Sequence, residues 1–179
     1  MFGLFKKKDP GVRVTDIVWM SEQARREACY RAWQKNPSTL FLAWFEESKN
    51  QLEQFFRAQS AGNYSISLAG FSGMPAPGTP LLFIEHYPVR NEEQARFSAM
   101  GLDEVKVYSC LEEPLFRFFG GARLITIVEK LGNRADEPIE HALVTASIQK
   151  AQDKLAEKMI VSGSARSQED WFINASITL

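Results

Sequence analysis

The sequence predicts an α/β fold whose mostly parallel β-sheet is covered by helices on both faces, and three observations support this prediction. Short apolar runs alternate along the chain with stretches of helix-forming composition, a pattern typical of parallel strands joined by crossover helices. Two of these runs, residues 39–45 and 80–85, are continuous, as in strands buried on both faces. The 179 residues, 45% hydrophobic and 24% charged, have the composition of one ordinary globular domain.

The first half of the chain reads as strand, helix, strand, helix. Residues 12–19 form the first predicted strand. Ser21 has the side chain of a helix N-cap and Pro37 follows the expected end, so a helix is predicted from 21 to about 34. The apolar run 39–45 is the second strand. Residues 46–58 form the next predicted helix, with their apolar side chains on one side.

The second half continues this alternation. Residues 64–69 and 105–111 alternate like half-buried strands, residues 80–85 form a buried strand, and helical stretches lie between and after them. Pro138 fits the first turn of a long helix, where its missing N–H costs nothing. Apolar residues then recur at helical spacing as far as Leu155, and Ser167 starts a further helix to about Ala175.

These elements predict three parts of the chain. Residues 1–10 are a flexible tail, residues 11–135 form the α/β domain, and residues 136–179 form a C-terminal helical extension. Residues 1–8, MFGLFKKK, place three lysines after a very short apolar run. They are either a frayed end or, at most, a weak peripheral contact with an anionic membrane surface.

Composition argues against several classes of function. A net charge of −1 and an isoelectric point near 6.2 disfavour nucleic-acid binding, which requires a basic surface. No apolar run approaches the roughly 18 residues of a membrane-spanning helix. Cys29 and Cys110 have neither paired nor metal-ligand spacing, which favours reduced thiols in a cytoplasmic protein.

A metal or acid–base site is a weaker hypothesis. Glu85 and His86 stand next to each other at the end of a predicted strand, with Glu92 and Glu93 nearby. Adjacent strand residues diverge, and a metal site needs at least three converging ligands. Cys110 follows Ser109 in a predicted strand with no obvious base beside it, so a nucleophile is not expected there either. We therefore expect no metal.

Two segments resemble one known family. Residues 136–155 read DEPIEHALVTASIQKAQDKL, and residues 107–119 read VYSCLEEPLFRFF. The first resembles the point where the second motor domain of the SecA-type preprotein translocase ATPase passes into its long scaffold helix. The second is similar to a Phe-Tyr-Leu-Ser-Leu-Glu-Asp pattern of that domain. Residues 16–33, 39–56 and 80–86 are similar to it more weakly, so that the resemblance covers most of residues 16–155.

The resemblance implies a three-layer RecA-like domain of the P-loop NTPase type, corresponding to a truncated and degenerate second motor domain. The phosphate loop G-x-x-x-x-G-K-[ST] of the family's first motor domain has no counterpart in this sequence. Residues 94–101, QARFSAMG, stand where the family has Gln-x-x-Gly-Arg-x-Gly-Arg. Glu85, Gln94 and Arg96 are thus expected as a remnant of a nucleotide site, without the arginines that stabilise transferred phosphate.

Phe97 and Met100 replace charged catalytic positions of the family, and we hypothesise that they form a protein-interaction surface. The function expected is a non-catalytic, SecA-like binding or regulatory module in the cytoplasm, linked to protein export, with a protein partner or a second copy of itself. We expect this module to need no cofactor and to have no catalytic residue. The alternative is half of an ATPase site, which binds ATP only when a partner supplies the phosphate loop.

Overall fold

A computed structural model describes residues 11–70, 75–118, 120, 125–126, 130, 132, 134, 136–140, 142–159 and 164–177. Within them, five parallel strands form one sheet in the order β1-β5-β4-β2-β3. The strands are β1 (Arg13–Trp19), β2 (Leu40–Ala43), β3 (Ser65–Leu68), β4 (Leu81–Phe83) and β5 (Glu104–Cys110). The predicted α/β class and parallel sheet are confirmed, and the arrangement is consistent with a three-layer RecA-like domain.

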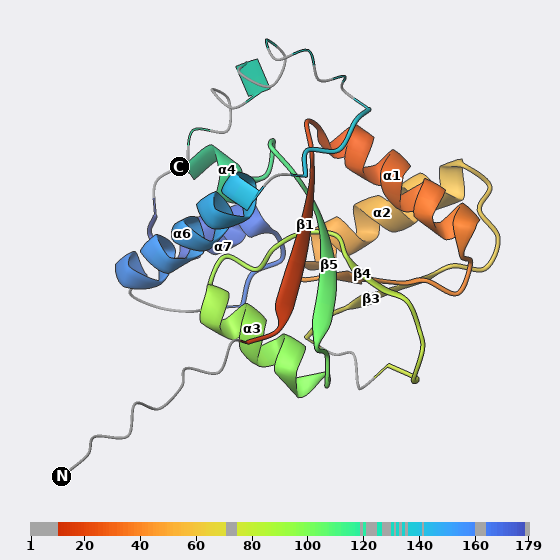
Figure 1. Cartoon of the computed structure of the whole chain (residues 1–179), viewed down its shortest axis with the longest axis horizontal. Coiled ribbons are helices and arrows are strands. Elements are labelled where there is room, and N and C mark those ends of the chain that lie inside the picture. Colours follow the sequence, from red (N-terminus) through yellow and green to blue (C-terminus); the bar gives the residue numbers. More distant parts are fainter. Residues whose placement is uncertain are drawn as a thin grey trace.

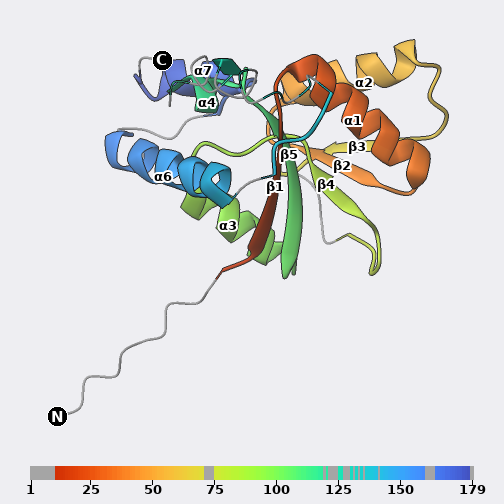
Figure 2. The same ribbon diagram turned by 45° about the horizontal axis from the view of Figure 1, so that its top comes forward.

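Helices cover both faces of this sheet (Figure 1). One face carries α1 (Glu22–Lys35) and α2 (Glu46–Ala58), and the other carries α3 (Arg90–Ala99) and α6 (Ala142–Lys158). The short helices α4 (Pro114–Phe118) and α7 (Gln168–Asn174) pack with α6 near the carboxyl ends of the strands (Figure 2). The sheet is therefore a middle layer, and its carboxyl edge is bordered by the C-terminal helices.

Alternation along the strands divides the core between the two faces, because successive strand side chains point in opposite directions. Toward α1 and α2 lie Cys29, Phe41, Ala43, Leu52, Phe56, Leu82 and Ile84. Toward α3 lie Leu42, Phe83, Phe97, Met100, Val105 and Val107. Strands β2 and β4 contribute to both clusters, which explains why their sequences are continuously apolar.

The predicted helix starts are only partly confirmed. Ser21 caps α1, its Oγ accepting a hydrogen bond from the backbone N–H of Ala24 at 3.2 Å, as predicted. Pro138, in contrast, does not lie in the first turn of α6, which begins at Ala142. The residue after it, Ile139, forms an antiparallel bridge with Val18 through backbone hydrogen bonds of 2.7 and 3.2 Å. This pairing with the edge of β1 keeps the segment extended.

The described part of the chain contains no helix with the length and apolar composition needed to cross a membrane. The predicted tail and membrane contact of residues 1–8 lie outside the described residues. The domain boundary predicted at residue 136 stays a prediction. Ile148, Ala151 and Leu155 of α6 share one buried cluster with Val18 of β1.

Phe97 provides a test of this core. Its ring is fully buried, with its centroid 4.7 Å from that of Phe83. We expect Phe97→Ala to lower the free energy of unfolding by about 3–5 kcal/mol, because it leaves a cavity between helix and sheet. Urea denaturation measures this change. Ile173→Ala is the matched control, since Ile173 is 68% exposed and should change stability by less than about 0.5 kcal/mol. Equal effects of the two changes would contradict the described packing.

Candidate functional site

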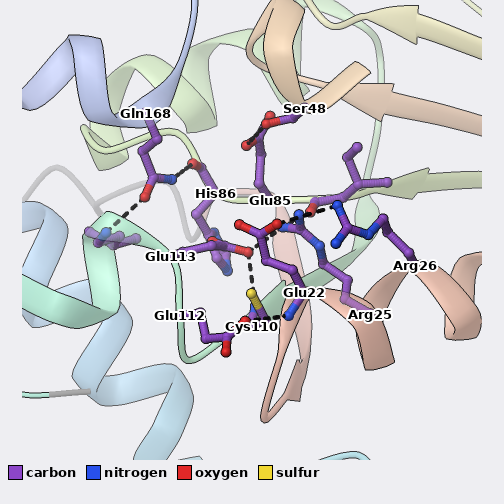
Figure 3. A network of polar contacts seen from close by, with 12 residues as sticks. Glu22, Arg25, Arg26, Ser48, Glu85, His86, Cys110, Glu112, Glu113 and Gln168 are labelled. Carbon is purple, nitrogen blue, oxygen red and sulfur yellow. Dashed lines mark hydrogen bonds and ion pairs between the residues drawn. The ribbon is translucent and has the colours of Figure 1, made fainter. Parts of the chain in front are cut away.

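The carboxyl edge of the sheet is where a parallel α/β fold most often binds a ligand. Strands β2 and β4 are neighbours, yet the helices that follow them, α2 and α3, lie on opposite faces. In open α/β sheets, such a switch creates the crevice in which ligands bind. Here the crevice holds a network of buried polar side chains from several elements (Figure 3).

Glu85 lies at the centre of this network, just after β4. Its Oε1 accepts hydrogen bonds from the backbone N–H groups of Trp44 and Phe45, at 2.9 and 3.2 Å. Its Oε2 accepts one from Ser48 Oγ at 2.6 Å. Helix α2 lacks a side-chain cap from its own N-cap residue, Phe45. Glu85 therefore occupies the N-terminus of α2, the position at which such folds bind anions.

A second carboxylate closes the N-terminus of α1 in the same way. Glu112, in the turn after β5, accepts a hydrogen bond from the backbone N–H of Glu22 through its Oε2 at 2.9 Å. Helices α1 and α2 both begin at this edge, on the same face of the sheet. At each start, a glutamate of the protein itself binds one or two backbone N–H groups. At each helix start, protein groups therefore occupy part of the position at which an anionic ligand would bind.

One arginine offsets the buried charge. Arg25 of α1 is buried, and its Nη1 donates to Glu113 Oε1 at 2.5 Å and to the carbonyl oxygen of Ile84 at 2.7 Å. Glu113 Oε1 also accepts from the backbone N–H of Cys110 at 2.8 Å. Burial raises the pKa of Glu113 to about 7, although Arg25 opposes that shift. Burial likewise raises the pKa of Glu85, although Arg25 and the hydrogen bonds that Glu85 accepts oppose that shift.

A second buried group joins β1, α3 and the end of β4. His86 lies between two carboxylates, with Nδ1 3.0 Å from Glu93 Oε1 and Nε2 2.9 Å from Asp16 Oδ1. Burial disfavours a charged imidazole, but the charge of Glu93 and the contacts with both carboxylates outweigh it and hold the pKa of His86 well above its ordinary value. The pair of carboxylates thus keeps His86 as a buried cation.

Two glutamine side chains connect this edge to the C-terminal helices. Gln152 Nε2 of α6 donates to the carbonyl oxygen of Tyr87 at 2.7 Å and to Glu93 Oε2 at 2.9 Å. Gln168 of α7 donates from Nε2 to the carbonyl oxygen of His86 at 3.1 Å, and its Oε1 accepts from Leu115 N–H at 2.7 Å. The C-terminal helices are therefore hydrogen-bonded to the edge they border.

A cavity of about 100 Å³ remains in the crevice. Its described lining residues include the glutamates Glu22, Glu47, Glu85, Glu113 and Glu169, whereas Arg25 is the basic residue among them. Because Arg25 is already paired with Glu113, this lining favours cationic or neutral groups over phosphates. Among the described residues, no group of three or more His, Cys, Asp or Glu side chains is arranged to hold a metal ion.

The three residues expected as a nucleotide-site remnant each hydrogen-bond a different part of the backbone. Glu85 caps α2, as described above. Gln94 binds both backbone polar groups of Val12, at 2.8 and 3.2 Å, and so fixes the start of β1 to α3. Arg96 donates from Nε to the carbonyl oxygen of Ala69 at 2.6 Å, just after β3. Their role in binding a nucleotide remains a prediction.

Phe97 and Met100 do not form the surface expected from the sequence. Their side chains are 0% and 2% exposed, and both pack in the core cluster between α3 and the sheet. Both residues lie on the side of α3 that packs against the sheet. Apolar side chains at such positions are buried in the core and form no surface. We therefore withdraw them as an interaction surface.

The acid–base candidates separate in a similar way. His86 and Glu93 meet as the sequence allowed, but Glu85 faces α2. His141 lies outside the described residues. The thiols of Cys29 and Cys110 are buried and free, and burial raises the pKa of both, that of Cys29 to about 12. Neither thiol has the lowered pKa of a reactive cysteine.

Sequence reasoning missed the residues that hold the edge together: Asp16, Arg25, Glu113, Gln152 and Gln168. A weak signal was present for two of them. Asp16 interrupts the apolar side of a predicted strand, and Arg25 falls between Ala24 and Ala28 on the buried stripe of a predicted helix. Charges at such positions are rarely buried unless they are paired.

The Arg25–Glu113 pair gives a stability prediction. Arg25→Met should lower the free energy of unfolding by about 3–5 kcal/mol, because Glu113 is left buried without its counter-charge. The double variant Arg25→Met/Glu113→Leu should recover most of that loss. Urea denaturation of the single and double variants measures both changes. A double variant as unstable as the sum of the two single variants would show that the pair is not coupled.

His86 gives a prediction about pH. Because its folded pKa is raised, its contribution to stability is complete below the unfolded value of about 6.5 and is lost as pH rises through the folded value. The stability difference between wild type and His86→Gln should therefore shrink above about pH 6.5. Chemical denaturation across this range measures it. Glu93→Gln should lower the folded pKa of His86, so that the contribution of His86 to stability is lost at lower pH. A stability difference between wild type and His86→Gln that does not change with pH would contradict the raised pKa of His86.

No family model matches the chain. A segment is nevertheless similar to curated proteins named protein translocase subunit SecA. It is 48% identical over 50 residues to protein translocase subunit SecA 1 of Alkaliphilus metalliredigens, which is 28% of this chain and 6% of that protein. The SecA of Alkaliphilus oremlandii is 50% identical over 50 residues, again 28% and 6%. The SecA of Sorangium cellulosum is 45% identical over 53 residues, 30% and 5%.

These similarities confirm the resemblance to SecA for about 28–30% of this chain. The similar segment spans only 5–6% of the length of these relatives. The chain therefore contains a SecA-related segment within an α/β domain whose sheet is entirely parallel in the described residues.

Proposed function

We propose that this chain is a non-catalytic, SecA-like module that binds a protein and regulates preprotein translocation. The observation that carries the proposal is the carboxylate of Glu85 at the N-terminus of α2. A phosphate at this helix start would need the backbone N–H groups at and near the N-cap. Glu85 takes those of Trp44 and Phe45, and the carbonyl oxygen of Arg166 takes that of Glu47 at 2.9 Å. A nucleotide would have to displace a buried carboxylate before it could bind there.

The charge of the crevice supports the same proposal. Its described lining carries several glutamates, and the guanidinium of Arg25 is committed to Glu113. The carboxylates of these glutamates would repel a triphosphate bound in the crevice. The repulsion would be strong because the crevice has a low dielectric constant. The sequence also contains no phosphate loop, the element that binds the phosphates of ATP in P-loop NTPases.

The link to translocation rests on the SecA-related segment. Proteins named protein translocase subunit SecA carry a similar segment within much longer chains. A homologous segment in a different chain can keep the protein contacts that the segment makes in SecA. The partner we propose is a protein of the translocation apparatus, SecA included, or a second copy of this chain. The alternative remains an ATP half-site completed by a partner's phosphate loop.

The experiment has two arms that use the purified full chain. In the first, ATP turnover is measured with SecA as the positive control, and the chain is expected to show none. ATP turnover by the chain, or ATP binding that Arg96→Ala weakens, would favour the half-site alternative and overturn the proposal.

In the second arm, binding of the chain to purified SecA and its effect on SecA-driven preprotein translocation into membrane vesicles are measured. We expect saturable binding in the micromolar range and a changed rate of translocation. An unrelated protein of similar size and charge is the control. The proposed link to translocation fails if the chain neither binds SecA nor alters the rate at saturating concentration.

A further inference from the structure

A second concave site lies on the opposite half of the sheet. A groove of about 330 Å³ runs between α1 and the first residues of β4 and β5. Thr39 and Pro80, which precede β2 and β4, also line it. The described lining of the groove shares no residue with that of the acidic crevice, although Trp19, the last residue of β1, lines part of the groove. Its volume falls at the lower end of the range of about 300–1,000 Å³ for small-molecule pockets.

The sequence of α1 explains why this groove is open. Arg31, Ala32 and Lys35 come three, four and seven residues after Ala28, so the four share one face of the helix. Ala28 is buried and Ala32 half-buried, whereas Arg31 and Lys35 are exposed, so this face lies at the boundary between the sheet and solvent. Here it offers two methyl groups and two cations. The space beneath the second half of α1 consequently stays unfilled.

The sheet side of the groove is also unusual. Strand β5 is an interior strand, and Val105 and Val107 are buried toward α3. On its other face stand Lys106, which is exposed, and Tyr108, which is half-buried. Interior strands of parallel sheets are normally apolar on both faces because helices cover them. A lysine at this position marks a part of the sheet that helix α1 leaves uncovered.

The groove is cationic with an apolar floor. Arg31, Lys35 and Lys106 line it, and its described lining contains no acidic side chain. Within the described part of the chain, neither Lys35 nor Lys106 takes part in an ion pair, while Arg31 lies 3.9 Å from Glu27 and 5.7 Å from the centroid of the Trp19 ring. The side chains of Trp19, Tyr108 and Leu81 line the same groove.

Trp19 lies beside Tyr108 in the lining of the groove. Its side chain is 5% exposed, yet its indole Nε1–H has no hydrogen-bond acceptor among the described residues. Buried donors are nearly always paired, and an unpaired one needs an explanation. Its ring packs edge-on against Tyr108 at a centroid distance of 6.0 Å, within the lining of the groove. Trp19 and Tyr108 therefore form an aromatic wall of the groove.

We propose that this groove binds a small anion that carries a flat apolar group, its phosphate or carboxylate meeting Lys35 and Lys106 and its ring lying on Tyr108 and Leu81. Charge selects the anion, since the groove has cations where the carboxyl-edge crevice has glutamates. The aromatic and leucine floor selects a flat apolar group over a bare ion. This site is independent of the proposed function of the chain.

The test is a titration of the full ¹⁵N-labelled chain followed by NMR. Phenyl phosphate and benzoate are the probes, inorganic phosphate tests the bare ion, and benzamidine is a flat cation of similar size. We expect saturable shifts of the Trp19 indole N–H and of the Leu81 and Lys106 amides with phenyl phosphate or benzoate. Trp19→Phe assigns the indole signal. Whichever of the two binds more tightly identifies phosphate or carboxylate as the natural group.

Charge variants make the result decisive. Lys35→Glu and Lys106→Glu should each weaken binding about tenfold, and raised salt should weaken it further. Lys150→Glu, at an exposed position of α6 on the other face, is the matched control and should leave the affinity unchanged. The proposal is overturned if neither flat anion shifts these signals at millimolar concentration. It also fails if benzamidine binds equally well, or if both lysine variants keep the wild-type affinity.

Discussion

The backbone N–H groups at the starts of α1 and α2 set the main constraint on this structure. Both helices begin at the carboxyl edge of the sheet, where their first N–H groups cannot be satisfied within the helix. Glu112 and Ser21 bind N–H groups at the start of α1, and Glu85 and the Arg166 carbonyl bind N–H groups at the start of α2. Buried carboxylates are costly, and the chain offsets that cost with Arg25, which is held by Glu113 and by the Ile84 carbonyl. The position at which many α/β proteins bind an anion is thus filled from within.

The C-terminal helices follow from the same constraint. Once the edge is filled by side chains, it can be covered by protein, provided that its remaining polar atoms find partners. Gln152 and Gln168 supply those partners to His86, Tyr87, Glu93 and Leu115. Around these amides, apolar residues of α4, α6 and α7 form one buried cluster with Val18 and Leu111. The C-terminal segment is therefore packed onto the edge that a ligand would otherwise approach.

The two halves of the sheet differ sharply in charge, which a net charge of −1 conceals. The carboxyl-edge crevice is lined by glutamates, whereas the groove beneath α1 is lined by Arg31, Lys35 and Lys106. Recognition depends on such local fields, because charges more than about 8–10 Å apart are largely screened in salt solution. The composition argument against a broad nucleic-acid surface is compatible with a local site for one small anion.

The sequence by itself determined the order of strands and helices, the α/β class and the resemblance to SecA. Periodicity carries this information because strand and helix place side chains at fixed local repeats, and the predicted helix 46–58 agrees with α2. Tertiary structure decided what those side chains meet. Phe97 and Met100 looked like a converted surface but are buried, Pro138 precedes a bridge to Val18, and Glu85 proved to be a helix cap. These outcomes depend on contacts between residues tens of positions apart, which no local repeat encodes.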